Sequence, residues 1–238
     1  MTSPAGTRQT PRDRARIELT REIKRVALRQ VGESGAAALS LRAVARELGL
    51  GSASALYRYF PGRDALLTAL IIDSYTALGT AAEDAERRVH DQSILTRWMA
   101  ICHAVRDWAV TNQHEYALIF GTPIPGYAAP PDTIAPGTTV PTLMIGLLAE
   151  LFMTDPPSIP REDVPEEVRR SARPLLSRVP PQVPEQLAVR GVMAWTYLFG
   201  VVSFEVFGHR REIVTDPEPF FDYEIRQLAI TLGLTGPA

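Results

Sequence analysis

Residues 40–60 read SLRAVARELGLGSASALYRYF, and this stretch decides the fold. Its first half places apolar residues along one helical face behind Ser40, which is a favourable N-cap. Gly49 is expected to end this helix in the left-handed conformation, which glycine adopts without a steric cost. A second helix over residues 52–60 follows the glycine-containing turn, so the stretch predicts a helix-turn-helix.

The outward residues of the second helix are small or carry a hydroxyl group. Ser52, Ser54 and Ala55 would let the helix backbone approach base edges in the major groove of DNA. Tyr hydroxyl groups and Arg guanidinium groups can hold phosphates. Such side chains follow at Tyr57, Arg58, Tyr59 and Arg63. The pattern therefore predicts double-stranded DNA as a partner.

The formal net charge of −2 hides a strong asymmetry along the chain. Residues 1–63 carry 12 basic and 5 acidic side chains, whereas residues 64–238 carry 13 basic and 22 acidic ones. This division indicates a basic module that touches a polyanion and an acidic body that does not. Because Lys24 is the only lysine, arginine is expected to make most of the phosphate contacts.

Composition excludes several classes of protein. With 45% hydrophobic residues among 238, the chain is expected to be globular with a large core. The single cysteine, Cys102, excludes an internal disulfide framework and is expected to be a buried structural thiol. The N-terminus is polar and rich in arginine, and residues 191–204 are expected to form a buried helix rather than a membrane span. A cytoplasmic protein without membrane contact is expected.

Catalytic chemistry finds little support in the sequence. The four histidines, at positions 90, 103, 114 and 209, lack metal-ligand spacing, and there is no glycine-rich phosphate loop. Glu205 and His209 are spaced for a structural pair on one helix, which is favoured over a catalytic dyad. No enzyme activity, cofactor, metal or catalytic residue is expected.

The rest of the chain predicts helices only, about nine or ten in all. A flexible basic arm is expected over 1–13, and the proline-rich segment 121–137 is not expected to form a regular helix. The helices are expected near residues 14–35, 40–48, 52–60, 63–78, 92–120, 139–153, 166–178, 187–207 and 218–233. The predicted fold class is all-α.

Residues 14–74 resemble the DNA-binding domain of the TetR family of bacterial transcriptional regulators. The resemblance rests on Glu-Ser-Gly35, on the run LSLRAVA from Leu39 and on the run LYRYFPGRDALL from Leu56. It implies a helix-turn-helix domain over 14–74 and a ligand-binding and dimerisation domain over 75–238. It also implies that Arg42 touches a base or phosphate. The candidate DNA contacts are thus Ser40, Arg42, Ser52, Ser54, Ala55, Tyr57, Tyr59 and Arg63.

Structural roles remain as alternatives for residues in and around this set. Tyr57 has an alternative as a partly buried core residue, Arg58 as a solvated surface residue and Arg46 as the partner of an acid. Ser54 and Tyr59 stand where the family often has Gly and His, and Arg63 where it has Lys. The change at Ser54 bears on which bases are read.

The C-terminal half resembles a TetR subgroup named for a Trp-His-Gly signature. The likeness lies in residues 120–130 and 191–209, with Trp195 and Gly200 present and Phe199 where the His is often found. The family resemblance implies a homodimer through the last two helices, 187–207 and 218–233. A symmetric dimer of this kind presents two recognition helices about 34–36 Å apart to a palindromic operator.

Large apolar residues in the body favour a pocket for an unknown, largely apolar or aromatic small-molecule effector. For any single residue a plain core role is the favoured alternative. The candidate pocket residues are Trp98, Cys102, Tyr116, Phe120, Tyr127, Met144, Leu148, Phe152, Trp195 and Phe199. The resemblance implies a repressor released from DNA by its ligand. The alternatives are a DNA-binding regulator without a ligand and, less favoured, a helical small-molecule-binding enzyme.

Overall fold

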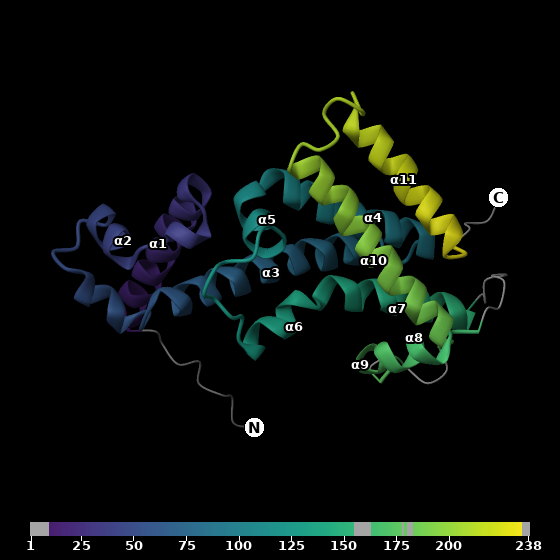
Figure 1. Ribbon diagram of the computed structural model, residues 1–238, viewed down its shortest axis with the longest axis horizontal. Helices are drawn as coiled ribbons and strands as arrows, with labels where there is room; N and C mark the ends of the chain where they lie inside the picture. Colours follow the sequence, from purple (N-terminus) through teal and green to yellow (C-terminus); the bar gives the residue numbers. More distant parts are fainter. Residues whose placement is uncertain (1–9, 155–162, 178, 180–182, 235–238) are drawn as a thin grey trace, which may run out of the picture. The chain divides into compact units, whose positions relative to one another are not determined.

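The computed structural model describes residues 10–154, 163–177, 179 and 183–234, and within them every regular element is a helix (Figure 1). The all-α prediction is confirmed. Among these residues the helix expected over 166–178 is divided into α8 (Glu166–Ser171) and the single turn α9 (Arg173–Leu176). Another single turn, α6 (Ile134–Gly137), follows the short 3-10 helix η3 (Pro131–Thr133) in the proline-rich segment.

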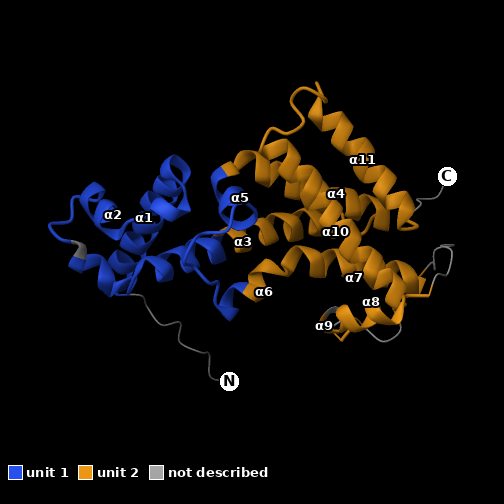
Figure 2. Cartoon of the chain, in the orientation of Figure 1, with its two compact units in different colours: residues 1–73, 114–133 blue, residues 74–113, 134–238 orange. Residues whose placement is uncertain are grey.

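The chain divides into two compact units, coloured separately in Figure 2. Unit 1 comprises Met1–Asp73 and His114–Thr133, and unit 2 comprises Ser74–Gln113 and Ile134–Ala238. Segment 114–133 thus groups with the N-terminal part of the chain, although its sequence position led us to place it in the C-terminal domain. The assignment of a function to each part stays a prediction.

The first helix of unit 1, α1, covers Pro11–Ser34 and begins three residues before the expected start. The hydroxyl of Thr10 accepts from the backbone N–H of Asp13, whose carboxylate accepts from the backbone N–H of Thr10. This capping box and the proline at the first helical position both favour a helix start here. Residues 11–13 of the predicted arm are therefore helical, and residues 1–9 lie outside the described part of the chain.

The core of unit 1 contains buried side chains from α1, from the short helices that follow it and from the start of α3 (Arg63–Arg88). The side chains of Ile23, Val44, Leu56, Leu66 and Leu67 are fully buried. Burying each such side chain stabilises the fold by about 1.5–3 kcal/mol relative to leaving it in water. This core fixes the short helices on α1 and α3.

The second segment of unit 1 begins at α5 (Gln113–Phe120). A Cβ atom added to Gly32 of α1 would lie 2.7 Å from the ring of His114, so α5 approaches α1 at a position where only glycine leaves room. Farther along, the Tyr127 hydroxyl hydrogen-bonds with that of Thr68 on α3 at 2.9 Å. These contacts explain why residues 114–133 group with unit 1.

Unit 2 is built on α4 (Ile94–Thr111), α7 (Thr139–Thr154) and α10 (Glu185–Val206), which pack against one another. The last helix, α11 (Pro217–Thr231), packs on α4 and α10. A Cβ atom added to Gly191 would lie 3.1 Å from Leu148, so this glycine permits the close approach of α10 to α7.

Charged side chains inside unit 2 are paired. Arg97, which is 6% exposed, donates to Glu86 at 2.7 Å and to Glu150 at 2.7 Å. Arg106 forms a bidentate pair with Glu205 at 2.8 and 2.6 Å, a typical arrangement for a strong charge-assisted contact. The predicted pair of Glu205 with His209 is therefore wrong. Because α10 ends at Val206, the His209 ring leaves the helix and lies against Phe204 instead.

By length and composition alone, α3 and α10 are apolar enough to cross a membrane, as is the bent combination of residues 131–137 with α7. Within the described structure these helices contribute core residues to the two units. The one charge midway along α3, that of Asp73, pairs with Lys24 of α1 at 2.7 Å. Packing against neighbouring helices thus accounts for the apolar character of α3 and α10.

Candidate nucleic-acid interface

The turn of the predicted helix-turn-helix is formed by the end of α2 (Leu41–Glu47). Gly49 has φ of 66°, the N–H of Leu50 donates to the carbonyl of Ala45, and that of Gly49 donates to the carbonyl of Arg46. This is a Schellman motif, and it confirms the expected left-handed glycine. At the other end of α2, Ser40 occupies the N-cap position in an extended conformation without a capping side-chain hydrogen bond.

The element after the turn is a 3-10 helix, η2 (Ala53–Arg58), so the helix predicted over 52–60 is shorter and tighter than expected. The hydroxyl groups of Ser52 and Ser54 hydrogen-bond to each other beside its first turn. Serine side chains compete with the helical backbone for hydrogen bonds, and Pro61 prevents continuation of the helix. Six residues are also too few for a stable isolated α-helix.

The two sides of η2 differ in exposure. Leu56 is buried in the core of unit 1, as is Phe60 just after η2, whereas Tyr57 is 51% exposed. Exposure therefore favours the binding interpretation of Tyr57 over the core alternative. The candidate contacts Arg42, Ser52, Ser54 and Tyr57 are exposed, and Ser40, Ala55, Tyr59 and Arg63 are half-buried.

Two candidate contacts already have partners within unit 1. The Arg63 guanidinium donates to the carbonyl oxygens of Ala36 and Ala37 at 3.0 and 3.2 Å. The Tyr59 ring lies under the guanidinium of Arg16, 5.8 Å from its centroid. These contacts give both side chains a structural role, and their predicted phosphate contacts stay predictions.

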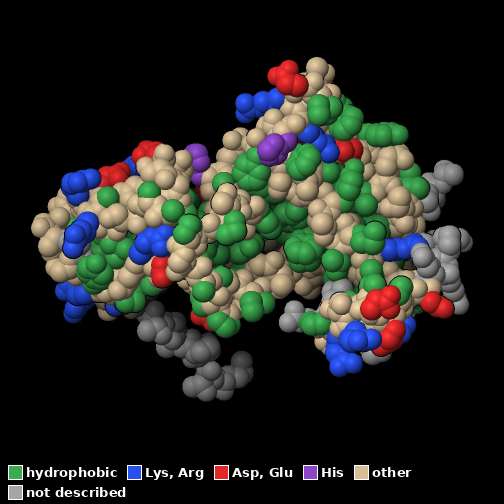
Figure 3. Space-filling model, in the orientation of Figure 1, with side chains coloured by type: hydrophobic (Ala, Val, Ile, Leu, Met, Phe, Trp, Pro, Cys, Tyr) green, Lys and Arg blue, Asp and Glu red, His purple; other side chains and the backbone are tan. Residues whose placement is uncertain are grey.

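Arginines without an intramolecular partner gather around the turn. Arg42, Arg46 and Arg58 are exposed and make no hydrogen bond or ion pair with any described residue. The acid next to Arg46, Glu47, instead pairs with Arg29 of α1. Figure 3 shows Lys and Arg side chains gathered over this end of unit 1. The alternatives of a solvated surface residue for Arg58 and an acid partner for Arg46 came from the sequence, and the structure leaves both guanidinium groups available to an anion.

Comparison with known proteins decides the family. The HTH-type transcriptional regulator Rv1816 of Mycobacterium tuberculosis is 35% identical to this chain over 225 residues, covering 92% of this chain and 94% of the relative. Residues 23–70 match the family described as bacterial regulatory proteins of the tetR family, and residues 98–228 match the tetracyclin repressor-like C-terminal domain. The chain belongs to the TetR family.

Solved structures agree with membership of the TetR family. The crystal structure of the regulatory protein SCO4313 is 31% identical, with a TM-score of 0.75, and the match covers 92% of this chain and 98% of that one. The TetR family transcriptional regulator PfmR from Thermus thermophilus matches in fold, with a TM-score of 0.57 at 16% identity over 91% of this chain and 99% of that one. This TetR family member is a DNA-binding transcriptional regulator, and it is not an enzyme.

The residues predicted for an effector pocket are divided between the two units. Tyr116, Phe120 and Tyr127 belong to unit 1, and the other seven belong to unit 2. The Tyr116 and Phe120 ring centroids are 5.0 Å apart, and those of Trp195 and Phe199 are 6.0 Å apart. No single unit contains the whole set, and its role in ligand binding stays a prediction.

Buried polar atoms of three predicted pocket residues, Trp98, Cys102 and Trp195, lie in unit 2. The indole N–H groups of Trp98 and Trp195 are buried and have no hydrogen-bond partner among the described residues. Unsatisfied buried donors are rare in folded proteins. Cys102 is fully buried, and burial raises the pKa of its thiol, so it is an inert thiol as expected.

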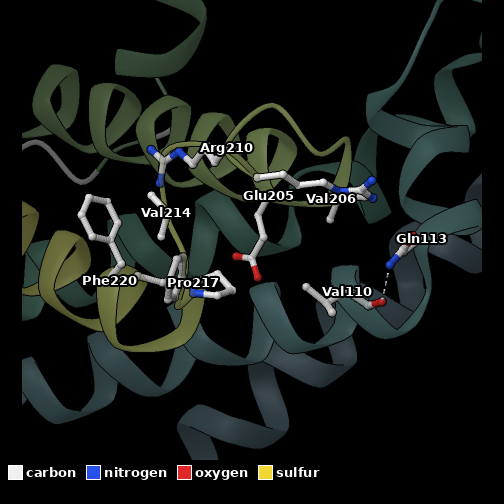
Figure 4. A pocket seen from close by; sticks show the side chains of 10 residues that line it. Val110, Gln113, Glu205, Val206, Arg210, Val214, Pro217 and Phe220 are labelled. Carbon is white, nitrogen blue, oxygen red and sulfur yellow. Dashed lines mark hydrogen bonds between the residues drawn. The ribbon is translucent and has the colours of Figure 1, made fainter.

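A different pocket is open in unit 2, with a cavity volume of about 250 Å³. It lies among the end of α4, the end of α10, the loop that follows and the start of α11 (Figure 4). It is lined by Val110, Gln113, Glu205, Val206, Arg210, Arg211, Val214, Pro217, Phe220 and Phe221. None of the predicted pocket residues lines it. The one local signal for it is the Arg210-Arg211 doublet just before the proline-rich start of α11.

Proposed function

We propose that this regulator is a homodimeric repressor that binds a palindromic operator and leaves it when a small, largely apolar or aromatic molecule binds its body. The observation that carries this proposal is the surface around the Gly49 turn. It presents Arg42, Ser52, Ser54 and Tyr57 to solvent, with unpaired arginines beside them. Small side chains for base edges and cations for phosphates are what a major-groove reader needs.

Release follows from a shift between two conformations of the dimer. A ligand that binds better to the form whose readers are badly spaced for successive major grooves lowers the affinity for DNA. The large apolar side chains of unit 2, such as Trp98, Met144 and Trp195, support an apolar or aromatic ligand. The likeness of α10 to the Trp-His-Gly subgroup and a cytoplasmic location are parts of the same proposal.

Removing the exposed reader side chains is expected to weaken operator binding. Arg42→Ala and Tyr57→Ala should each cost about 1–3 kcal/mol, because each removes a base or strong phosphate contact. Titration with an operator fragment, itself isolated by genome-wide selection of bound DNA, measures the change. Tyr57→Phe separates the hydroxyl from the ring, and Arg170→Ala on α8 serves as the exposed arginine control. Wild-type affinity in both alanine variants would remove these residues from the interface.

The proposed dimer face lies on α10 and α11. Both helices expose large apolar side chains, over which Figure 3 shows a broad hydrophobic surface. They include Met193, Tyr197, Phe204, Phe220, Tyr223 and Ile230. Contiguous apolar surface of this kind marks a protein interface, and a two-fold dimer would bury it symmetrically.

Charge placed on this face is expected to separate the subunits. The double variant Met193→Glu and Tyr223→Glu changes side chains that are 65% and 62% exposed, so the protomer fold should survive. Sedimentation analysis should then give a monomer. Circular dichroism should show that its helix content is unchanged. Met153→Glu on α7, at a side chain 61% exposed, is the control and should stay dimeric. A dimeric double variant would place the interface elsewhere.

A further inference from the structure

The pocket between α4, α10 and α11 combines an apolar wall with an excess of positive charge. We propose that it binds a small monocarboxylate with an apolar body, whose carboxylate pairs with Arg211. This site is separate from the predicted effector pocket, and the proposal stands whether or not the chain represses transcription.

The acid that lines the pocket is already neutralised. Glu205 accepts both of its hydrogen bonds from Arg106, at 2.8 and 2.6 Å, and its side chain is only 16% exposed. Arg106 itself is held by this pair and lies 5.5 Å from the ring centroid of Phe221. The carboxylate of Glu205 is therefore a fixed part of the wall and does not repel an incoming anion as a free carboxylate would.

The two arginines that line the pocket are not equivalent. Arg210 forms a bidentate pair with Glu224 at 2.6 and 3.0 Å. Arg211 makes no hydrogen bond or ion pair with the described residues, and it is exposed. Among the charged residues that line the pocket, Glu205 is paired with Arg106 and Arg210 with Glu224, so Arg211 is the one lining charge without a partner among the described residues. A single carboxylate would balance it, and the planar guanidinium can hold that group with two hydrogen bonds.

The backbone at Gly208 leaves room for the side chain of Arg211 beside the pocket. Gly208 has φ of 77°, and a Cβ atom added there would lie 2.9 Å from Nε of Arg211. The glycine thus allows the chain to turn sharply after α10 and leaves room for the arginine side chain to lie against it.

The remaining lining favours an apolar body of limited size. Val206, Val214, Pro217 and Phe220 form the wall, and in Figure 4 Pro217 and Phe220 lie across the cavity from Val110. Phe221 forms the buried base of the pocket, because its side chain is 1% exposed. The ring centroid of His103 lies 5.4 Å from that of Phe221. A cavity of about 250 Å³ lies just below the usual range of ligand sites, roughly 300–1,000 Å³. It therefore suits one aromatic ring or a short chain.

The test uses the full-length protein and a matched pair of probes, 4-fluorophenylacetate and the uncharged 4-fluorophenylacetamide. Binding is followed by broadening of the ¹⁹F resonance during titration. The acid should show saturable binding about tenfold tighter than the amide, because only the acid brings a negative charge to the Arg211 guanidinium. Arg211→Gln should remove this preference, whereas Arg170→Gln on α8 should keep it. Val110→Trp, which fills the cavity, should weaken both probes.

Three outcomes would overturn the proposal. The first is equal binding of acid and amide, and the second is an unchanged preference in Arg211→Gln. The third is binding that appears only in the monomeric Met193→Glu, Tyr223→Glu variant, which would show that a second copy covers the pocket. Operator binding is measured separately, so a failure of the repressor proposal would leave these results standing.

Discussion

Replacing Arg97 by Met is expected to lower the free energy of unfolding by about 3–5 kcal/mol, a cost typical of breaking a buried ion pair from one side. The guanidinium holds Glu86 of α3 and Glu150 of α7 from its place on α4. Without it, the Glu86 side chain, which is 12% exposed, would keep its charge in a poorly solvated position.

At acidic pH, the free energies of unfolding of the Arg97→Met variant and of the wild type should lie closer together. Burial raises the pKa of Glu86, but hydrogen bonds from His90 and Arg97 outweigh this and hold that pKa below its usual value. A carboxylate of this kind stabilises the fold above its unfolded-state pKa, and the contribution is lost as pH falls through the folded-state pKa.

Urea unfolding at neutral and acidic pH measures both effects. Arg169→Met is the matched control, because Arg169 also joins two acids, Glu166 and Glu185, but at a side chain 43% exposed. Surface pairs of this kind contribute about 0–1 kcal/mol, so the control should unfold close to the wild type. Equal losses in the two variants would contradict a special role for the buried pair.

Operator affinity is expected to fall steeply with salt, by about 10³–10⁵-fold between 50 and 200 mM if a dimer contacts six to ten phosphates. The physical reason is the release of counterions from DNA as arginines neutralise phosphates. Arg42, Arg46 and Arg58 are exposed and unpaired within the described structure, and are the main candidates for these contacts.

Fluorescence anisotropy titrations of a labelled operator at several salt concentrations give the slope directly. Arg46→Gln and Arg58→Gln should each reduce the slope by about one for every phosphate that the arginine neutralises. Arg21→Gln on α1 is the control, because Arg21 is paired with Glu18. A flat salt profile would contradict the phosphate contacts proposed here.

The fold was largely predictable, because its decisive features are local. Spacing of apolar residues located the helices, and Gly49 marked the turn. The exceptions have local causes that the spacing of apolar residues does not register. The capping box of Thr10 and Asp13 starts α1 early, and the serine pair beside η2 favours a 3-10 helix.

The candidate site was predictable only where exposure follows from helix periodicity. That rule indicated Tyr57, but it could not show that Arg63 donates to carbonyl groups 26 and 27 residues away. The pocket between α4, α10 and α11 depends on Arg106 and Glu205, which are 99 residues apart in the chain. Size alone could not separate ligand-binding residues from core residues: Trp98 and Met144 are fully buried, and packing and ligand binding use the same kinds of side chain.

The buried thiol of Cys102 can report on the opening of unit 2 in the unmodified protein. It is the only cysteine in the chain and is fully buried on α4. A thiol-reactive dye therefore cannot label the protein until α4 opens or unfolds, so the labelling rate measures the opening of unit 2 without any engineered probe. Any small molecule or DNA that stabilises unit 2 will slow that rate, which provides a screen for effectors before one is known.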